Sequence, residues 1–277
     1  MLGTVRIVVG ARKGGAGKTV LTALLARELV RQQCRVLVLD LDPQRVGVSF
    51  RLGADVSSPL PYSAVDLVLG ARGRPFAPQV IIPGRLDLIA ANQRDLASLE
   101  KRLREVHEER KLTAGPGARR AVLDSRLTMA EVGYDFVLVD TPTGFGEITT
   151  NALEAAHVVI SPIDMKSADN VESVIDLLEH MGEVSRKSIV YFVANKYVAR
   201  ELQCQAALAR ARVLCGTRLL ASALPECTAV PRAMTEHRDV VASSETAAAL
   251  SEAVWQLGQI IIGQISAAAV ALGGASA

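Results

Sequence analysis

The sequence predicts a single α/β domain, built as a doubly wound, mostly parallel sheet with helices on both faces. Short apolar runs rich in β-branched residues, such as VRIVV, VLVLD and FVLVD, are typical of strands that are buried on both faces. Segments with apolar residues at helical spacing alternate with these runs, and right-handed crossovers then make the strands parallel. We expect residues 1–277 to form this one domain, with 263–277 as a frayed C-terminal tail.

The composition limits the possible classes of function. A net charge of +2 implies no strong overall attraction to nucleic acid, and 4% aromatic residues are too few for base-stacking platforms. The four cysteines form no C-x-x-C pair and have no histidine at metal-ligand spacing, which favours free thiols in a reducing cytoplasm. The apolar start is only as long as a strand, so we expect no signal peptide and a cytoplasmic location.

The first expected strand, 5–10, leads directly into the stretch GARKGGAGKT, which ends at Thr19. Glycine-rich loops between a strand and a helix bind phosphates, because backbone N–H groups and the helix dipole converge on the anion. Here Lys18 would reach the β- and γ-phosphate oxygens, and Thr19 would give its hydroxyl to Mg²⁺. The residues expected to hold the nucleotide phosphates are Gly14, Gly15, Ala16, Gly17, Lys18 and Thr19.

This loop departs from the strict phosphate-loop pattern at one position, because Arg12 stands where the first glycine should be. It carries a second lysine instead, Lys13, directly before the glycine pair. The alternative interpretation is a glycine-rich turn with two surface lysines.

The second expected strand, 36–40, ends in Asp40 and is followed by the sequence LDPQ. Acidic residues just beyond the carboxyl end of a strand, beside a phosphate loop, lie where ligands bind in doubly wound sheets. The spacing of Asp42 from Lys18 therefore favours a functional role. The alternative is an ordinary turn at Asp42 and Pro43.

A further fully apolar strand, 136–140, ends in Asp140 and is followed by TPTG. Such a strand-end carboxylate, the Walker B residue, holds Mg²⁺ through water while the strand stays dry. Any strand can end in Asp, so this interpretation depends on the order of the three motifs along the chain.

The remaining segments complete the alternation of strands and helices. Residues 51–83 are rich in Gly and Pro and predict loops around one short helix, 63–69. A strand at 86–90 precedes a charged helix that Asn92 caps and that runs to about residue 110. From residue 254 onward no charge appears, but the weak hydrophobicity favours a helix packed on the domain over a membrane span. The other expected elements are a helix at 118–129, a strand at 157–161, a helix at 167–181 and a strand at 188–196.

The form K-G-G-x-G-K-T resembles the deviant Walker A motif of the ParA/MinD family of ATPases. The resemblance runs from about Val5 to Ile262 and also rests on the sequences DLDPQ, FVLVDTP, VANK and LPE. The family usually shows D-x-P-P or D-x-P-A-G at the Walker B position, and this chain departs from that pattern at Thr143. The resemblance implies a P-loop fold, ATP and Mg²⁺ as cofactors, and hydrolysis of ATP to ADP and phosphate.

The resemblance also implies roles for single residues. Lys13 would cross to the nucleotide of a partner subunit in an ATP sandwich dimer, and Asp42 would orient the attacking water. With Lys18, these two residues would catalyse hydrolysis by positioning and electrostatics. Asp40 would lie near Mg²⁺, together with the other two expected metal-site residues, Thr19 and Asp140.

For the base, the resemblance implies that Asn195, at the end of the strand 188–196, reads the adenine edge. Leu224 and Pro225 of the later segment would pack on the ring. The alternative for Asn195 is a plain strand-terminating turn.

At the level of function, the resemblance implies a homodimer that binds DNA without sequence preference and drives chromosome or plasmid segregation. A ParB-like centromere-binding partner would stimulate hydrolysis, and the protein would be nucleoid-associated, with no stable membrane insertion. The window 186–218 holds seven basic side chains and one acidic one, so we expect the DNA contacts there. The alternative is a solvated helix face whose arginines keep the protein soluble. The expected DNA-binding residues are Arg200, Arg210, Arg212 and Arg218.

Related classes of protein carry features that this sequence lacks. A MinD-like ATPase needs a basic amphipathic C-terminal helix. A nitrogenase-iron-protein-like reductase needs cysteines after the Walker B strand, and a related tyrosine kinase carries a tyrosine-rich tail. An ATPase that positions another cargo, such as a membrane, secretion or polysaccharide-synthesis complex, stays open. A nucleotide-binding scaffold without hydrolysis is the non-enzyme alternative, and Asp42 argues against it.

Overall fold

The structure is a computed structural model. It describes residues 3–42, 44, 47–54, 60, 62–70, 75–90, 93–114, 122–166, 169–184, 188–227 and 252–263.

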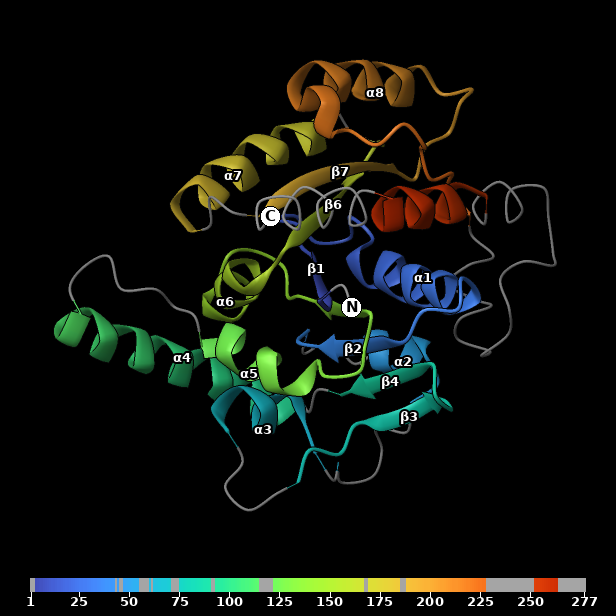
Figure 1. The fold of residues 1–277 in the computed structure, drawn as a ribbon. Helices are drawn as coiled ribbons and strands as arrows, with labels where there is room; N and C mark the ends of the chain where they lie inside the picture. The colour runs from blue at the N-terminus through green and yellow to red at the C-terminus, as the bar shows by residue number, and fades with distance from the viewer. Residues whose placement is uncertain are drawn as a thin grey trace, which may run out of the picture.

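Within these residues, seven strands form one sheet in the order β3-β4-β2-β5-β1-β6-β7 (Figure 1). Every neighbouring pair is parallel except β3 and β4, which run antiparallel. Because β5 lies between β1 and β2, these three strands end side by side, and Asp40 pairs in register with Asp140. The carboxyl edge of the sheet therefore gathers the first three motifs of the sequence. The strands are β1 (Val5–Val9), β2 (Val36–Asp40), β3 (Gln79–Ile82), β4 (Leu86–Ile89), β5 (Phe136–Asp140), β6 (Val158–Asp164) and β7 (Ile189–Asn195).

Helices cover both faces of this sheet (Figure 1). On β2, Val36 and Val38 join the core beneath α1, α2 and the helix 252–263, whereas Leu37 and Leu39 join the core beneath α3 to α8. Alternate residues of a strand point to opposite faces, so this strand is buried on both. The predicted doubly wound fold is confirmed. The helices are α1 (Lys18–Arg31), α2 (Val48–Arg51), α3 (Ala64–Leu69), α4 (Gln93–Ala114), α5 (Val122–Ala130), α6 (Glu147–Ala155), α7 (Asp169–Val184) and α8 (Leu202–Cys215).

Some elements differ from the sequence prediction. β3 lies in a segment predicted as loop, and it pairs with β4 at the edge of the sheet. β6 continues to Asp164, beyond the predicted end at residue 161, and so reaches the level of the phosphate loop. α4 continues to Ala114, and its expected cap, Asn92, lies outside the described residues. The same holds for residues 118–121 of the next predicted helix.

The C-terminal helix, 252–263, packs on α1. The sequence predicts a helix packed on the domain. Val254, Leu257 and Ile261 are buried, and Gln259 Nε2 donates a hydrogen bond to Gln32 Oε1 over 2.9 Å. None of the helices in the described ranges has both the length and the apolar character needed to cross a bilayer. Residues 264–277, most of the predicted frayed tail, lie outside those ranges.

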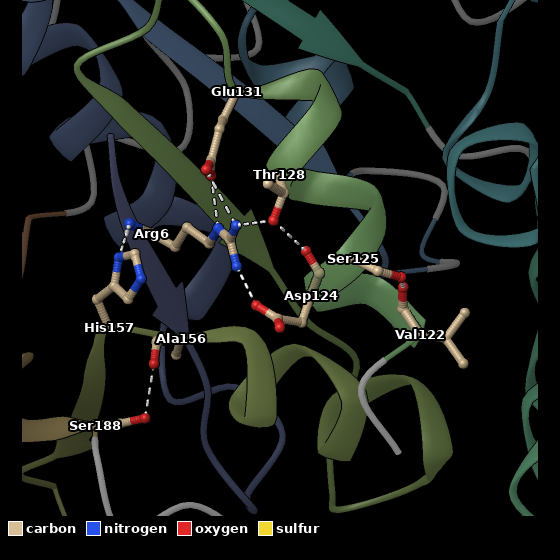
Figure 2. Close-up of polar contacts among 9 residues, drawn as sticks. All are labelled: Arg6, Val122, Asp124, Ser125, Thr128, Glu131, Ala156, His157 and Ser188. Atoms are coloured by element: carbon tan, nitrogen blue, oxygen red, sulfur yellow. Dashed lines mark hydrogen bonds and ion pairs between the residues drawn. The ribbon is translucent and has the colours of Figure 1, made fainter. Parts of the chain in front are cut away.

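A buried arginine joins the sheet to α5 at the end of the strands opposite the phosphate loop (Figure 2). Arg6 of β1 is 4% exposed, and its Nε donates to Glu131 Oε2 over 2.6 Å. Its other guanidinium nitrogens pair with Asp124 and donate to Thr128 Oγ1, and its backbone N–H donates to His157 Nδ1. A buried charge left without partners is strongly destabilising, so these contacts fix α5 against β1.

Candidate nucleotide-binding site

The glycine-rich loop lies between β1 and α1, which begins at Lys18. Gly17 has a φ of 100°, a left-handed conformation that favours glycine. A Cβ atom at this position would also lie 2.2 Å from Asn195 Nδ2. The backbone angle therefore favours glycine at position 17, and a larger residue would also displace the Asn195 side chain.

Lys18 is buried, with 5% of its surface exposed, and its Nζ donates to Thr143 Oγ1 over 3.2 Å. Burial lowers the pKa of Lys18, while the nearby Asp140 and Asp42 carboxylates oppose that shift. Thr143 is the position at which the sequence departs from the usual Walker B pattern. Its hydroxyl joins the Walker B segment to the phosphate loop.

Asp140 is fully buried beside the first turn of α1. Its Oδ1 accepts a hydrogen bond from Thr22 Oγ1 over 3.3 Å, and the nearby Thr19 hydroxyl acts to lower its pKa. Its Oδ2 has no hydrogen-bond partner among the described residues. The pKa of Asp140 is raised well above its usual value, chiefly by burial and next by the Asp40 carboxylate.

Asp40 is buried as well, but both of its oxygens accept hydrogen bonds. Ser49 donates to Oδ2 with its backbone N–H and its hydroxyl, and the Asp42 backbone N–H donates to Oδ1 over 3.1 Å. Burial raises the pKa of Asp40 to about 6, although the bonds from Ser49 and Asp42 oppose the shift. Asp40 therefore holds the segment after β2 in place and leaves Asp140 Oδ2 as the available oxygen.

These residues fit a magnesium ion that binds with a nucleotide. A buried carboxylate oxygen without a partner, next to the Thr19 hydroxyl, offers the oxygen ligands that Mg²⁺ prefers. Among the described residues, no group of three or more His, Cys, Asp or Glu is arranged to hold a metal alone. Such a group is not needed in P-loop proteins, where the Ser/Thr hydroxyl and the nucleotide phosphates share the ion with a Walker B carboxylate.

Asp42 follows β2 by two residues and is 7% exposed. Its Oδ1 accepts a hydrogen bond from the Gln44 backbone N–H over 3.1 Å. Burial raises the pKa of Asp42, and the Lys18 ammonium opposes that shift. Asp42, Asp140 and Lys18 thus influence one another electrostatically, as one site requires.

The end of β7 contacts the back of the loop. Asn195 Nδ2 donates to the Ala16 carbonyl over 2.7 Å, and Lys196 Nζ donates to the Gly15 carbonyl over 2.6 Å. Pro225, the second predicted base contact, lies in a segment that pairs with Tyr197, just beyond this strand end. The structure thus places Pro225 beside the end of β7, where Asn195 contacts the phosphate loop.

Lys13 is exposed, and its Nζ donates to Asn170 Oδ1. Asn170 is buried, and its Nδ2 donates to the Asp164 carbonyl over 2.9 Å, which fixes the side chain. A pocket of about 230 Å³ opens here; it is lined by Lys13, Gly14, Ala16, Pro162, Asp164, Asn170 and Ser173.

Only some of the basic side chains in the predicted DNA-binding window are exposed and available for phosphate contacts. Arg200, Arg212 and Arg218 are exposed, and within the described ranges none of them forms an ion pair. Arg210 pairs with Glu172 of α7, at 2.6 Å from its Nη2. Lys196, which adds to the positive charge of this window, points into the phosphate loop instead. Residues 186 and 187 lie outside the described residues.

Several residues of the site carried no signal in the sequence. Thr22 and Ser49 are ordinary helix residues by pattern, yet each donates to a site carboxylate. Asp164 and Asn170 frame the pocket beside Lys13. Lys196 could have been suspected only from its place directly after Asn195. The fold and this site together define a P-loop nucleotide-binding protein.

Comparison with known proteins agrees with this class. Residues 4–191 match the model of a family described as an AAA domain. A relative from Pseudomonas putida, described as an uncharacterized protein, is 30% identical over 65% of this chain and 63% of its own length. The chain therefore spans less than two thirds of that relative. The chromosome-partitioning ATPase Soj of Thermus thermophilus is 28% identical over 79% of this chain and 80% of its own length.

Two solved structures are also similar. A single-residue variant of Cyanothece McdA in complex with ATP aligns with a TM-score of 0.76 over 94% of this chain and 96% of its own, at 20% identity. Cobyrinic acid a,c-diamide synthase from Mycobacterium smegmatis, with bound ADP and magnesium, aligns with a TM-score of 0.68 at 26% identity. That alignment covers 90% of this chain and 91% of the synthase. The chain belongs to the ParA/MinD family of P-loop ATPases.

Proposed function

We propose that this protein hydrolyses Mg²⁺-bound ATP and closes into a homodimer while ATP is bound. The observation that carries the proposal is the opposite placement of two lysines of one loop. Lys18 is buried beside Asp140, which suits the phosphates of its own nucleotide. Lys13 is exposed, which suits a nucleotide held by a second copy of the chain.

In this proposal the protein acts by positioning and charge, because phosphoryl transfer needs little covalent chemistry from the protein. Lys18 neutralises phosphate charge, and Thr19 and Asp140 hold Mg²⁺, with Asp40 nearby. Asp42 orients the attacking water, and Lys13 adds a second positive charge from the partner. The bound nucleotide and magnesium supply the phosphoryl group and its counter-charge. Two observations support this assignment: Asp140 Oδ2 has no hydrogen-bond partner in the part of the chain that the structure describes, and the similar synthase structure contains magnesium.

We also propose that the dimer binds DNA without sequence preference and helps to segregate a chromosome or plasmid, associated with the nucleoid. The exposed arginines, Arg200, Arg212 and Arg218, supply the phosphate contacts, and a ParB-like partner stimulates hydrolysis. The support is the exposure of these side chains and the similarity to the chromosome-partitioning ATPase Soj. Dimerisation doubles this surface, so ATP should strengthen DNA binding.

The test is a gel-shift assay with random-sequence duplex, with and without ATP, across a salt series. The triple variant R200E/R212E/R218E should weaken binding by at least about tenfold and flatten the salt dependence, because phosphate contacts release counterions. Basal ATP hydrolysis should stay unchanged. The matched control is K101E/R102E/K111E, which reverses three exposed cations on α4 and should bind as the wild type does.

Three results would contradict parts of this proposal. If R200E/R212E/R218E binds DNA as tightly as the wild type does, the DNA surface lies away from residues 200–218. No binding by the wild type at low salt, together with normal ATP hydrolysis, would favour a family member that positions another cargo. A Lys18→Ala variant that hydrolyses ATP at the wild-type rate would contradict the phosphate-loop assignment itself.

A further inference from the structure

Two consecutive carbonyl groups of the phosphate loop accept hydrogen bonds from two consecutive side chains at the end of β7. Lys196 Nζ lies 2.6 Å from the Gly15 carbonyl oxygen, and Asn195 Nδ2 lies 2.7 Å from that of Ala16.

Peptide geometry gives these contacts a consequence on the opposite face. A trans peptide is planar, and its N–H points away from its C=O. The hydrogen bond from Lys196 to the Gly15 carbonyl therefore orients the Ala16 N–H of the same peptide away from β7. The hydrogen bond from Asn195 to the Ala16 carbonyl orients the Gly17 N–H in the same way. Such N–H groups are the ones with which glycine-rich loops bind phosphate. The positive charge of the Lys196 ammonium, next to the carbonyl oxygen, also polarises the peptide, which makes its N–H a better donor.

Lys196 is itself fixed in place. Its Nζ forms a second contact of 2.6 Å, with Asp164 Oδ2 at the end of β6, and the two side chains are 34% and 17% exposed. Its φ is 55°, a left-handed conformation that costs energy in a residue with a side chain and persists only where surroundings impose it. Asp164 is anchored in turn, because its carbonyl accepts a hydrogen bond from Asn170 and its residue pairs with Asn195. The ammonium therefore lies where two separate strand ends place it.

We propose that Lys196, braced by Asp164, is a positioning residue for phosphate binding, because it aims the Ala16 N–H through the Gly15 carbonyl. The proposal rests on nucleotide binding by this loop and does not depend on DNA binding or dimerisation. Its consequence is an affinity effect: ADP and ATP should lose binding alike, since both would contact the same part of the loop.

The test compares Lys196→Met, which keeps the length of the stem and removes the charge, with the wild type. Affinity for ADP, ATP and inorganic tripolyphosphate, measured by calorimetry with Mg²⁺, should fall by about tenfold for all three, as expected for a charged hydrogen bond. KM should rise while kcat changes little. In the nucleotide-free protein, amide hydrogen exchange at Ala16 should become faster. Lys111→Met, which breaks an exposed ion pair on α4, is the matched control and should change none of these.

Two further variants keep the test decisive. Lys196→Arg retains a cation and should recover part of the affinity. Asp164→Asn keeps Lys196 and removes the carboxylate that pairs with it. This variant should lower the affinity for all three ligands by about threefold, and it tests the proposal even if Lys196→Met does not fold.

Several outcomes would overturn the proposal. Unchanged affinity in a folded Lys196→Met or Asp164→Asn protein would show that the loop needs no such support. A loss for ADP and ATP but not for tripolyphosphate would place Lys196 at the base instead. A wild-type protein that binds none of the three ligands would instead contradict the proposed ATPase function.

Discussion

Among single residues, Asp140 of the nucleotide site has one carboxylate oxygen that no other described residue satisfies. Asp140 is fully buried, and its Oδ2 has no hydrogen-bond partner among the described residues. Burial raises the pKa of Asp140 well above 3.8, its ordinary value. An acid with a raised pKa holds its proton longer in the folded chain than in the unfolded chain, so its ionisation opposes folding.

Asp140→Asn should therefore stabilise the nucleotide-free protein at neutral pH. The stability linked to this acid is present below pH 3.8 and is lost as the pH rises through its raised folded pKa. Asparagine does not ionise, so the variant does not lose stability in this way as the pH rises. The difference in Tm between variant and wild type should therefore grow by about 2–4 °C between about pH 5 and pH 8. Thermal melts without Mg²⁺ and nucleotide measure this difference. Glu109→Gln, an exposed charge removal on α4, is the control, and a difference that does not change with pH would contradict the expectation.

The sequence could predict some residue contacts of the site and not others. Lys18, Asp40 and Asp140 follow strands in a recognisable order, and parallel strands bring their ends to one edge. The contact of Asn195 with Ala16 joins residues 179 positions apart, and no periodicity connects them. The same is true of Lys196, whose alkyl stem and charge gave no sign that it would point inward.

Among secondary-structure elements, α6 begins with a cap that another helix provides. Its N-cap residue, Gly146, offers no side-chain hydrogen bond. Glu100 of α4 instead accepts from the Glu147 and Ile148 backbone N–H groups over 2.7 and 3.0 Å. α6 follows the segment with Thr143, the residue that contacts Lys18, so this carboxylate fixes one end of the Walker B loop.

Glu100→Ala should destabilise the protein by about 1–2 kcal/mol, because the free N–H groups at the start of α6 lose their acceptor. Denaturant melts give this value. Glu105→Ala on the same helix removes a carboxylate that, within the described ranges, pairs with exposed cations alone, and it should cost less than about 0.5 kcal/mol. Equal effects of the two substitutions would show that Glu100 contributes no more than a surface charge.

β3 shows why one element was not predicted. Its four residues, QVII, stand between Pro78 and Pro83, and a short apolar run with flanking prolines is equally typical of a loop. Its pairing with β4 supplies the edge strand, and Val80 and Ile82 remain exposed. That outcome depends on tertiary pairing, which the local pattern does not contain.

For the whole molecule, the central question is how two copies would meet. Lys13→Ala should still bind ATP, because Lys18 remains beside the carboxylates, yet it should neither dimerise nor hydrolyse ATP. Asp42→Ala should do the opposite and accumulate an ATP-bound dimer, because the attacking water is no longer oriented. Light scattering with ATP and Mg²⁺ measures the molecular mass of each variant: it should double for Asp42→Ala and stay that of the monomer for Lys13→Ala. An Asp42→Ala protein that stays monomeric at saturating ATP would contradict the sandwich arrangement.

The helix 252–263 carries Trp255, the single tryptophan of the chain, which is 44% exposed. The same helix lies close to α1: a Cβ atom at Gly258 would come within 2.7 Å of the Gln32 side chain. All indole fluorescence of the protein therefore originates at one site on the helix that covers α1, and α1 begins at Lys18 of the phosphate loop. Iodide quenching of this emission gives a label-free optical signal of whether the C-terminal helix stays on α1 when nucleotide is added.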